Sequence, residues 1–352
     1  MTGVATIELR PGYGISRVIR GGWQLAGGHG PVDRAKTIDD LVAAFDAGIF
    51  TFDCADIYTG VEELYGEFRV RLRNTRGEAA ASQVKVHTKL VPDLALLPSV
   101  TRADIEKIID TSLRRLRVEA LDVVQFHWWD YNAPRWLDTL HWLDELRVKG
   151  KVRNIGGTNF DAAHVAAIVD AGIPLLSMQV QYSLLDHRPE SGLVQLCAKH
   201  RIALLCYGSV AGGFLSDRWL GAREPLGALE NRSLVKYKLI IEDFGGWALF
   251  QELLATLRNI ADRRSSDIAT VASRYVLERP GVAAVIVGAR TRAHLAANVA
   301  ISNIALDAAD HAAIARVHER RKGPTGEVYG LERDRTSRHG SIMKYDLNAK
   351  AS

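Results

Sequence analysis

Short apolar runs alternate along most of the chain with longer segments in which every third or fourth residue is apolar. The short runs have the length of buried strands, and the longer segments have the period of helices that bury one face. The helix expected after Thr101 shows this period, with apolar residues at Ile105, Ile108, Ile109, Leu113 and Leu116. The pattern predicts strands and helices in alternation.

Eight strands are expected, at residues 18–23, 50–53, 84–89, 121–127, 152–157, 175–179, 202–207 and 283–287. Alternating strands and helices favour a parallel sheet, and eight such units favour a (β/α)8 TIM barrel of the α/β class. A doubly wound open sheet is the alternative. No strand is followed by a Gly-x-Gly-x-x-Gly turn into a helix, which disfavours that alternative.

Further segments are expected around the barrel. Turn residues at 11–14 predict an N-terminal β-hairpin within residues 6–20, and a helical insertion precedes the last strand. Thr37 with Asp40 and Thr101 with Asp104 predict capping boxes at two helix starts. We expect one barrel domain over residues 1–322. The polar tail, residues 323–352, is either disordered or draped over the barrel, with Tyr329 and Tyr345 as candidate anchors.

Composition restricts the classes of partner. The 352 residues are 47% hydrophobic and 24% charged, as in a soluble globular protein with a full core. The net charge of +4 is scattered, so no basic stripe indicates nucleic acid. No apolar run reaches the roughly 18 residues that span a membrane. Three cysteines without metal-like spacing favour reduced thiols, and we expect a cytoplasmic protein that binds neither nucleic acid nor membrane.

Reactive side chains stand at the ends of three consecutive predicted strands. Asp53 and Tyr58 follow the second, Lys89 ends the third and His127 ends the fourth. Each has an ordinary explanation: a helix cap and a packing residue, a solvated rim charge, and a histidine in an aromatic cluster. Since a barrel brings the carboxyl ends of its strands to one mouth, their coincidence favours one site.

These groups suit carbonyl reduction. A lysine ammonium about 4 Å from a phenol would favour the phenolate by up to roughly 4 kcal/mol at an effective dielectric constant near 20. Asp53 would keep Lys89 charged and oriented, and His127 would donate a hydrogen bond to a substrate oxygen. Tyr58 would then be a proton donor beside an oxyanion-stabilising site. Asp56 is expected to be a structural acid.

The sequence resembles the aldo-keto reductase family over nearly its whole length. The motifs that carry the resemblance are Phe52-Asp-x-Ala-Asp-x-Tyr58, Glu63-x-x-Gly66, His87-Thr88-Lys89 and Asp122-Val-Val-Gln-Phe-His127. The resemblance implies that Asp53, Tyr58, Lys89 and His127 form a catalytic tetrad in which Tyr58 is the acid/base.

The resemblance also implies a nicotinamide cofactor. Thr158, Asn159 and Gln179 would hold its carboxamide, and Tyr207 would stack on its ring. Backbone amides of the loop would hold the pyrophosphate; its residues include Gly208, Ser209, Gly213 and Leu215. Ser209 and Val210 stand where the family has proline and leucine, and an alternative explanation is a merely flexible glycine loop.

The adenosine end departs furthest from the family pattern. Residues 286–291 resemble the family's Ile-Pro-Gly-Ala-Arg loop, with Val287 in place of proline. Gly288 and Arg290 would approach a 2′-phosphate, and Asn298 would contact adenine. His294 and Ala297 replace a basic and an acidic or amide residue. We expect NADP(H) rather than NAD(H), although Arg290 and Arg292 could be solvated charges at a helix start.

Trp23, Trp128 and Trp129 would form an aromatic pocket for an apolar carbonyl or alcohol substrate. Trp129 could instead pack into the barrel wall. The expected function is an NADP-dependent oxidoreductase. A cofactor-sensing regulatory subunit is the alternative, and a metal-dependent hydrolase is disfavoured because the eleven histidines include no His-x-His pair. No metal is expected. The oligomeric state, monomer or homo-oligomer, stays open.

Overall fold

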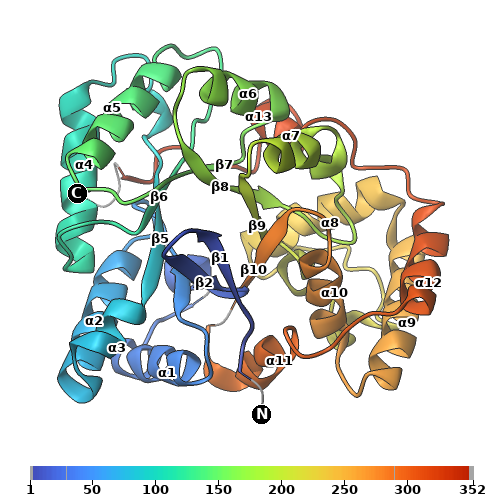
Figure 1. Cartoon of the computed structure of the whole chain (residues 1–352). Coiled ribbons are helices and arrows are strands. Elements are labelled where there is room, and N and C mark those ends of the chain that lie inside the picture. Colours follow the sequence, from blue (N-terminus) through green and yellow to red (C-terminus); the bar gives the residue numbers. More distant parts are fainter. Residues whose placement is uncertain (1–2, 29, 289, 349–352) are drawn as a thin grey trace.

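Eight parallel strands close into a barrel in the computed structural model of the chain, which describes residues 3–28, 30–288 and 290–348 (Figure 1). Around the barrel the strands are β10 (Val282–Gly288), β3 (Val18–Gly21), β4 (Thr51–Asp53), β5 (Lys85–Leu90), β6 (Val123–Phe126), β7 (Ile155–Thr158), β8 (Leu175–Gln181) and β9 (Ala203–Tyr207). β10 pairs with both β3 and β9, so the sheet has no free edge. The predicted barrel is confirmed, and the open sheet is wrong.

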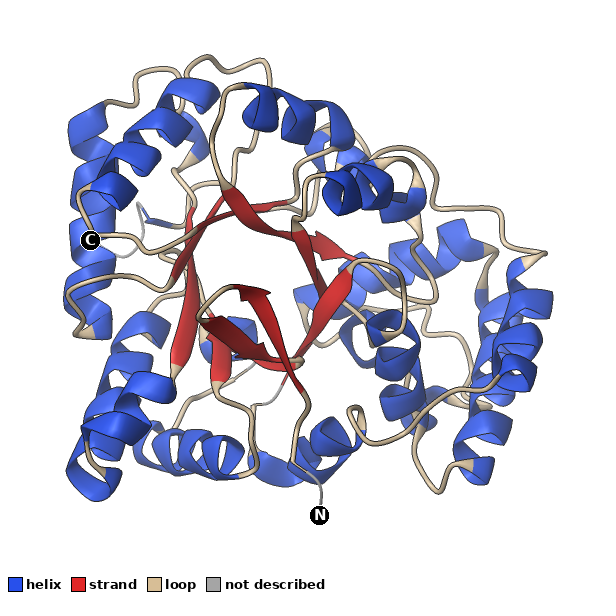
Figure 2. Cartoon of the chain, in the orientation of Figure 1, coloured by secondary structure: helices blue, strands red, loops and turns tan. Residues whose placement is uncertain are grey.

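Helices surround the strands on the outside (Figure 2). The main ones are α1 (Arg34–Asp46), α2 (Val61–Arg76), α3 (Glu78–Gln83), α4 (Arg102–Leu116), α5 (Trp136–Val148), α6 (Ala162–Asp170), α7 (Leu193–Lys199), α10 (Ile268–Leu277), α11 (Leu295–Ala300) and α12 (Ala308–His318). Short 3-10 turns lie at η1 (Trp23–Leu25), η2 (Leu94–Leu96), η3 (Arg188–Glu190) and η6 (Arg292–His294). None of the helices in the described part of the chain is both long and apolar enough to cross a membrane.

One of the two expected capping boxes is present. Thr101 and Asp104 cap α4 reciprocally, as predicted. The box expected at Thr37 is wrong, because the N-cap of α1 is Asp33, four residues earlier. Asp33 accepts from the Lys36 amide at 3.1 Å, and Thr37 lies inside the helix with its hydroxyl donating to the Asp33 carbonyl. Aspartate and threonine are both good N-caps, so residue type alone does not decide which of them caps α1. The helix begins after Asp33 because the backbone leaves its extended conformation there.

The hairpin of β1 (Thr6–Arg10) and β2 (Tyr13–Ser16) closes the amino-terminal end of the barrel. Ser16 exchanges hydrogen bonds with Thr51 at the start of β4, and the Arg17 guanidinium donates to carbonyls at the start of β10. Tyr13 and Ile15 pack with the apolar residues that fill the barrel interior. The opposite, carboxyl end is therefore the open mouth of the barrel interior.

The expected helical insertion lies between β9 and β10. Before α10 it contains η4 (Ala211–Gly213), η5 (Asp217–Trp219), α8 (Arg232–Phe244) and α9 (Trp247–Arg263). Four aromatic rings pack together in it, those of Phe214, Trp219, Trp247 and Phe250.

The tail, described to residue 348, crosses the carboxyl end of the barrel and forms one helical turn, α13 (Gly330–Arg333). Arg333 donates to the Trp129 carbonyl at 2.9 Å and the Asn159 carbonyl at 2.8 Å. Farther on, the Asn348 amide donates to the Val91 carbonyl at 3.1 Å. These bonds lie beyond the ends of β6, β7 and β5, so the tail borders the mouth.

Candidate active site

Asp53 and Lys89 form a buried ion pair at the mouth. The Lys89 ammonium lies 2.7 and 2.8 Å from the two carboxylate oxygens of Asp53, and it also donates to the Cys54 carbonyl at 2.8 Å. Both side chains are about 6–7% exposed. The contact arises because β4 and β5 are neighbours whose ends turn these side chains into the barrel. Burial with three hydrogen bonds holds the lysine in one position.

Two glutamine side chains complete this polar layer. Gln125 donates to Asp53 Oδ1 at 3.1 Å, and Gln179 donates both to the same oxygen at 2.6 Å and to Gln125 Oε1 at 3.0 Å. Gln179 has thus used its two N–H groups, and its Oε1 is the atom left to accept from a carboxamide. Gln125 was not among the predicted residues, although its place two before His127 puts it on the same strand face.

Tyr58 lies beside the ion pair. Its ring centre is 5.3 Å from the Lys89 ammonium and 5.2 Å from the ring centre of Trp23. Burial, and then the negative charge of Asp53, raise the pKa of Tyr58 well above its ordinary value. The lowering of the Tyr58 pKa expected from Lys89 does not appear; burial and the charge of Asp53 set the direction. Tyr58 is therefore a phenol at neutral pH, ready to donate a proton.

His127 is neutral and oriented by backbone. Burial, and then the charge of Arg333, lower the pKa of His127 to about 3. Its Nδ1 lies 3.2 Å from the Thr158 carbonyl, which only accepts, so Nδ1 carries the proton. Nε2 is buried and makes no hydrogen bond with the described residues. In this tautomer Nε2 accepts from a hydroxyl, so the expected donation to a carbonyl oxygen needs the other tautomer.

Residues expected to hold the carboxamide lie next to these groups. Thr158 ends β7 and pairs with Gln179 on β8. Asn159 follows with a left-handed φ of 63°, and its Oδ1 accepts from the Tyr207 hydroxyl at 2.8 Å. With Gln179 Oε1 as acceptor and the Asn159 amide as donor, this group has the complementary atoms that a carboxamide requires.

The glycine loop after β9 folds back on itself, and the Gly213 and Leu215 amides donate to the Val210 carbonyl at 2.9 and 3.2 Å. Gly208, Gly212 and Gly213 all have positive φ, which other residues adopt at a cost. A Cβ at Gly213 would meet no atom within 4 Å, whereas one at Gly208 would overlap the Tyr237 hydroxyl of α8. One side of the loop is therefore open to a ligand and the other is packed against α8. The residues present fit a dinucleotide cofactor.

The fold and this site agree with comparisons with known proteins. The model of the Aldo/keto reductase family matches residues 17–319. The chain belongs to the aldo/keto reductase family. Its members are oxidoreductases that act on carbonyl compounds with nicotinamide cofactors.

Two curated relatives indicate the range of the family. The NADH-specific methylglyoxal reductase of Escherichia coli is 27% identical over 316 residues, 84% of this chain and 92% of that protein. Flagellar radial spoke protein 5 of Chlamydomonas reinhardtii is 29% identical over 265 residues, 64% of this chain. The chain spans only about half the length of the latter, 49%.

Among solved structures, the glycerol dehydrogenase AKR11B4 from Gluconobacter oxydans has a similar fold. The TM-score is 0.74 at 23% identity, covering 90% of this chain and 95% of that one. At this identity the likeness concerns the fold alone.

The residues expected to hold the adenosine lie on the loop after β10 and on α11. Arg290 is exposed and donates to the Pro31 carbonyl at 3.2 Å, while Arg292 pairs with Asp40 at 2.9 Å. Asn298 is buried in α11, and Gly288 faces the Gln24 side chain. Residue 289 of the expected loop lies outside the described residues. Arg290 is thus better placed than Arg292 to contact a phosphate.

Two of the three expected tryptophans flank the tetrad. Trp23, 37% exposed, contacts Tyr58, and the Trp129 ring lies edge-on to His127 at 4.3 Å. Trp128 is not brought to the site. It is fully buried, packs against Phe126 and donates to the Ala133 carbonyl at 3.3 Å. His127, Trp128 and Trp129 follow the end of β6, and the chain there places Trp129 beside His127 and Trp128 in the core.

Helix α8 and the tail add residues that were not among the predicted site residues. The Lys236 ammonium lies 5.4 Å from the Tyr207 ring centre and 5.5 Å from that of Tyr329. Tyr329 also contacts His127 edge-on at 5.5 Å. Their positions depend on folding of distant segments, and only Tyr329 had a sequence signal, as a candidate anchor. They narrow the mouth beside Tyr207.

Proposed function

We propose that this chain is an NADP(H)-dependent reductase that converts aldehydes or ketones to alcohols, reversibly, with Asp53, Tyr58, Lys89 and His127 as its catalytic tetrad. The observation that carries the proposal is the buried Lys89–Asp53 pair beside a protonated Tyr58. The three buried free cysteines fit the reducing cytoplasm.

Tyr58 donates its proton to the carbonyl oxygen as negative charge develops there. A bound nicotinamide supplies the hydride for the carbonyl carbon. Lys89, fixed by Asp53, keeps a positive charge beside the phenolate that Tyr58 becomes. His127 Nε2 accepts from the hydroxyl of the alcohol, and Trp23 and Trp129 provide the apolar walls of the pocket. These roles favour an apolar substrate over a charged one.

The preference for NADP(H) rests on Arg290, whose planar guanidinium suits a phosphate and lies on the loop after β10. Thr158, Asn159 and Gln179 would hold the carboxamide and Tyr207 the ring. The loop of Gly208, Ser209, Gly213 and Leu215 would hold the pyrophosphate, with the Gly213 and Leu215 amides exchanging the Val210 carbonyl for phosphate oxygens. Gly288 and Asn298 would border the adenosine. The E. coli relative is named as NADH-specific, so both cofactors belong in the test.

The test is turnover of 4-nitrobenzaldehyde with NADPH and with NADH, and of the corresponding alcohol with NADP⁺ and NAD⁺. We expect reduction by NADPH with a larger kcat/KM than by NADH. Tight cofactor binding without turnover of any tested carbonyl would instead favour the cofactor-sensing regulatory subunit. The contacts of Lys236 with Tyr207 and Tyr329, which narrow the mouth, give that second candidate its support.

A further inference from the structure

A cavity of about 870 Å³ lies at the end of the barrel opposite the tetrad. Its walls come from the β1–β2 hairpin, from α2 and α3, and from the segment joining α4 to β6. Tyr13 separates it from the barrel interior, where the Tyr13 hydroxyl bonds His87 Nε2 at 3.1 Å. The cavity is therefore a compartment of its own and not an extension of the proposed active site.

The lining is strongly basic. Its cationic residues are Arg10, Arg69, Arg73, Lys85, Arg114, Arg117 and Arg153, and its carboxylates are Glu78, Glu119 and Asp122. Seven cations against three carboxylates leave an excess of four positive charges, equal to the formal net charge of the whole chain. The sequence shows the basic residues scattered, and the fold gathers them here.

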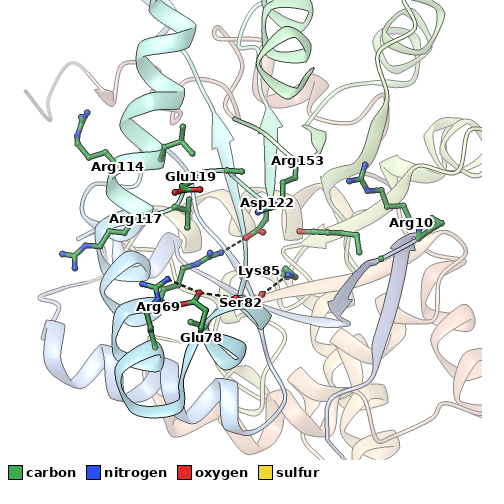
Figure 3. A pocket seen from close by; sticks show the side chains of 18 residues that line it. Arg10, Arg69, Glu78, Ser82, Lys85, Arg114, Arg117, Glu119, Asp122 and Arg153 are labelled. Atoms are coloured by element: carbon green, nitrogen blue, oxygen red, sulfur yellow. Dashed lines mark hydrogen bonds and ion pairs between the residues drawn. The ribbon is translucent and has the colours of Figure 1, made fainter. Parts of the chain in front are cut away.

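Ion pairs neutralise only part of this charge. Arg69 pairs with Asp122 at 2.6 Å, and Arg73 pairs with Glu78. Within the described residues, no carboxylate lies within ion-pair distance of Arg10, Lys85, Arg114, Arg117 or Arg153. Figure 3 shows Arg10 and Arg153 on one side of the hollow and Arg114 and Arg117 on the other. The guanidinium groups of Arg114 and Arg117 point outward in this view, so these two cations border the hollow without facing into it.

Hydrogen bonds fix the wall of the cavity between these two groups of cations, and one nitrogen of Arg69 in it has no partner among the described residues. Arg69 donates to Asp122 and, at 3.0 Å, to the Val84 carbonyl, while Asp122 accepts from the Val86 amide at 3.0 Å. These bonds fix the guanidinium on the strand starts. Its Nε is nevertheless buried and makes no hydrogen bond with the described residues. Because Nε is covered by protein, it cannot contact a ligand; what the cavity offers is a guanidinium already held in place.

We propose that this cavity binds a small molecule carrying two or more phosphate groups. The volume lies within the range of about 300–1,000 Å³ usual for small-ligand sites. Arginine dominates the lining, and its planar fork pairs with two phosphate oxygens at once. The cations line a concavity and do not follow a stripe along one face, which favours a compact ligand over nucleic acid.

The experiment is calorimetric titration of the full chain at about 0.15 M salt, chosen so that exposed charges are screened. Inorganic tripolyphosphate, ADP and fructose 1,6-bisphosphate are separate arms, which distinguish joined phosphates from phosphates on a carbon frame. Each arm is run with and without saturating NADP⁺, so that probe entering the proposed cofactor loop is recognised.

The test variant is Arg10→Gln/Arg153→Gln, and the matched control is Arg316→Gln/Arg321→Gln, which removes two exposed charges at and after α12. We expect at least one probe to bind with NADP⁺ present, and the test variant alone to weaken it by about tenfold or more. Absence of binding in every arm, or an equal loss in both variants, would overturn the proposal. A probe that NADP⁺ displaces and that the test variant binds as tightly as the wild type lies in the proposed cofactor loop, and this result would overturn it too.

Discussion

The Lys89 ammonium lies over the ring of Tyr58, 5.3 Å from its centre, while its hydrogen bonds go to Asp53 and to the Cys54 carbonyl. The ammonium therefore stands next to Tyr58, with a carboxylate matching its charge. Because burial and Asp53 raise the pKa of Tyr58, the resting side chain is a phenol. The arrangement favours proton donation, the direction that reduction requires.

Replacing Tyr58 by phenylalanine should abolish reduction and leave the fold intact. Phenylalanine keeps the ring contact with Trp23 and removes only the proton donor. We expect kcat for aldehyde reduction to fall by about 10²–10⁴-fold, the usual contribution of a general acid. Cofactor affinity, measured by protein fluorescence, is the control and should not change. A variant that reduces aldehydes within about threefold of the wild-type rate would exclude Tyr58 as the donor.

The dependence of the two directions on pH should differ. Reduction uses protonated Tyr58, whose pKa is raised well above its ordinary value, so kcat should be flat from about pH 6 to pH 9. The pKa of His127 is lowered to about 3, so its titration causes no change of rate near pH 6.5. Alcohol oxidation needs the phenolate and should accelerate with pH, by up to about tenfold per unit.

Initial rates of aldehyde reduction and of alcohol oxidation, measured from about pH 6 to pH 9, test this difference between the two directions. A fall in kcat for reduction with a midpoint near pH 7 would show that Tyr58 loses its proton far earlier than its surroundings indicate.

Replacing Lys89 by methionine should destabilise the fold. The change leaves the Asp53 carboxylate buried without its cation, which typically costs about 3–5 kcal/mol. Urea unfolding measures the loss. The double variant Asp53→Leu/Lys89→Met removes both charges and should recover part of the stability, although neither variant should reduce aldehydes. If the double variant is less stable than Lys89→Met alone, the pair is not the source of the loss.

Replacing Arg290 by alanine should weaken the binding of NADPH and leave the binding of NADH unchanged. If Arg290 contacts the 2′-phosphate, the KM for NADPH should rise about tenfold or more, as for loss of one charge-assisted contact, with no change for NADH. Arg292→Ala is the comparison, since Arg292 is engaged by Asp40. An unchanged KM for NADPH in Arg290→Ala would remove Arg290 from the phosphate site.

The sequence predicted the parts of this site that local pattern determines. Strand ends at Asp53, Lys89 and His127 follow from apolar runs and their spacing, and a barrel brings them together. The separation of Trp129 from Trp128 was not predicted, because both follow the end of β6, where strand alternation no longer applies. Arg333 could not be predicted, because its bond to Asn159 joins residues 174 positions apart on a tail without a strong pattern. Such contacts form only after the barrel has folded, because its assembled surface provides the carbonyls that the tail binds.

The tail provides a final prediction through Glu332. This carboxylate is buried between Arg188 at 2.8 Å and Lys236 at 3.4 Å. Burial raises the pKa of Glu332, but these two cations outweigh it and hold the value at about 2, below the usual 4.5. A lowered folded-state pKa means that the carboxylate stabilises the fold above about pH 4.5 and loses this effect as pH falls toward 2.

Glu332→Gln should therefore lower the free energy of unfolding at pH 7 by up to about 3 kcal/mol, the equivalent of the shift at 1.36 kcal/mol per unit. The gap between wild type and variant should close as pH falls from about 4.5 toward 2, since the wild type then loses the same charge. Urea unfolding along this series measures the gap. Glu319→Gln, at an exposed position just after α12, is the matched control and should show none. If the difference in free energy of unfolding between wild type and Glu332→Gln stays constant with pH, the stabilisation comes from packing and hydrogen bonding of the side chain and not from its charge.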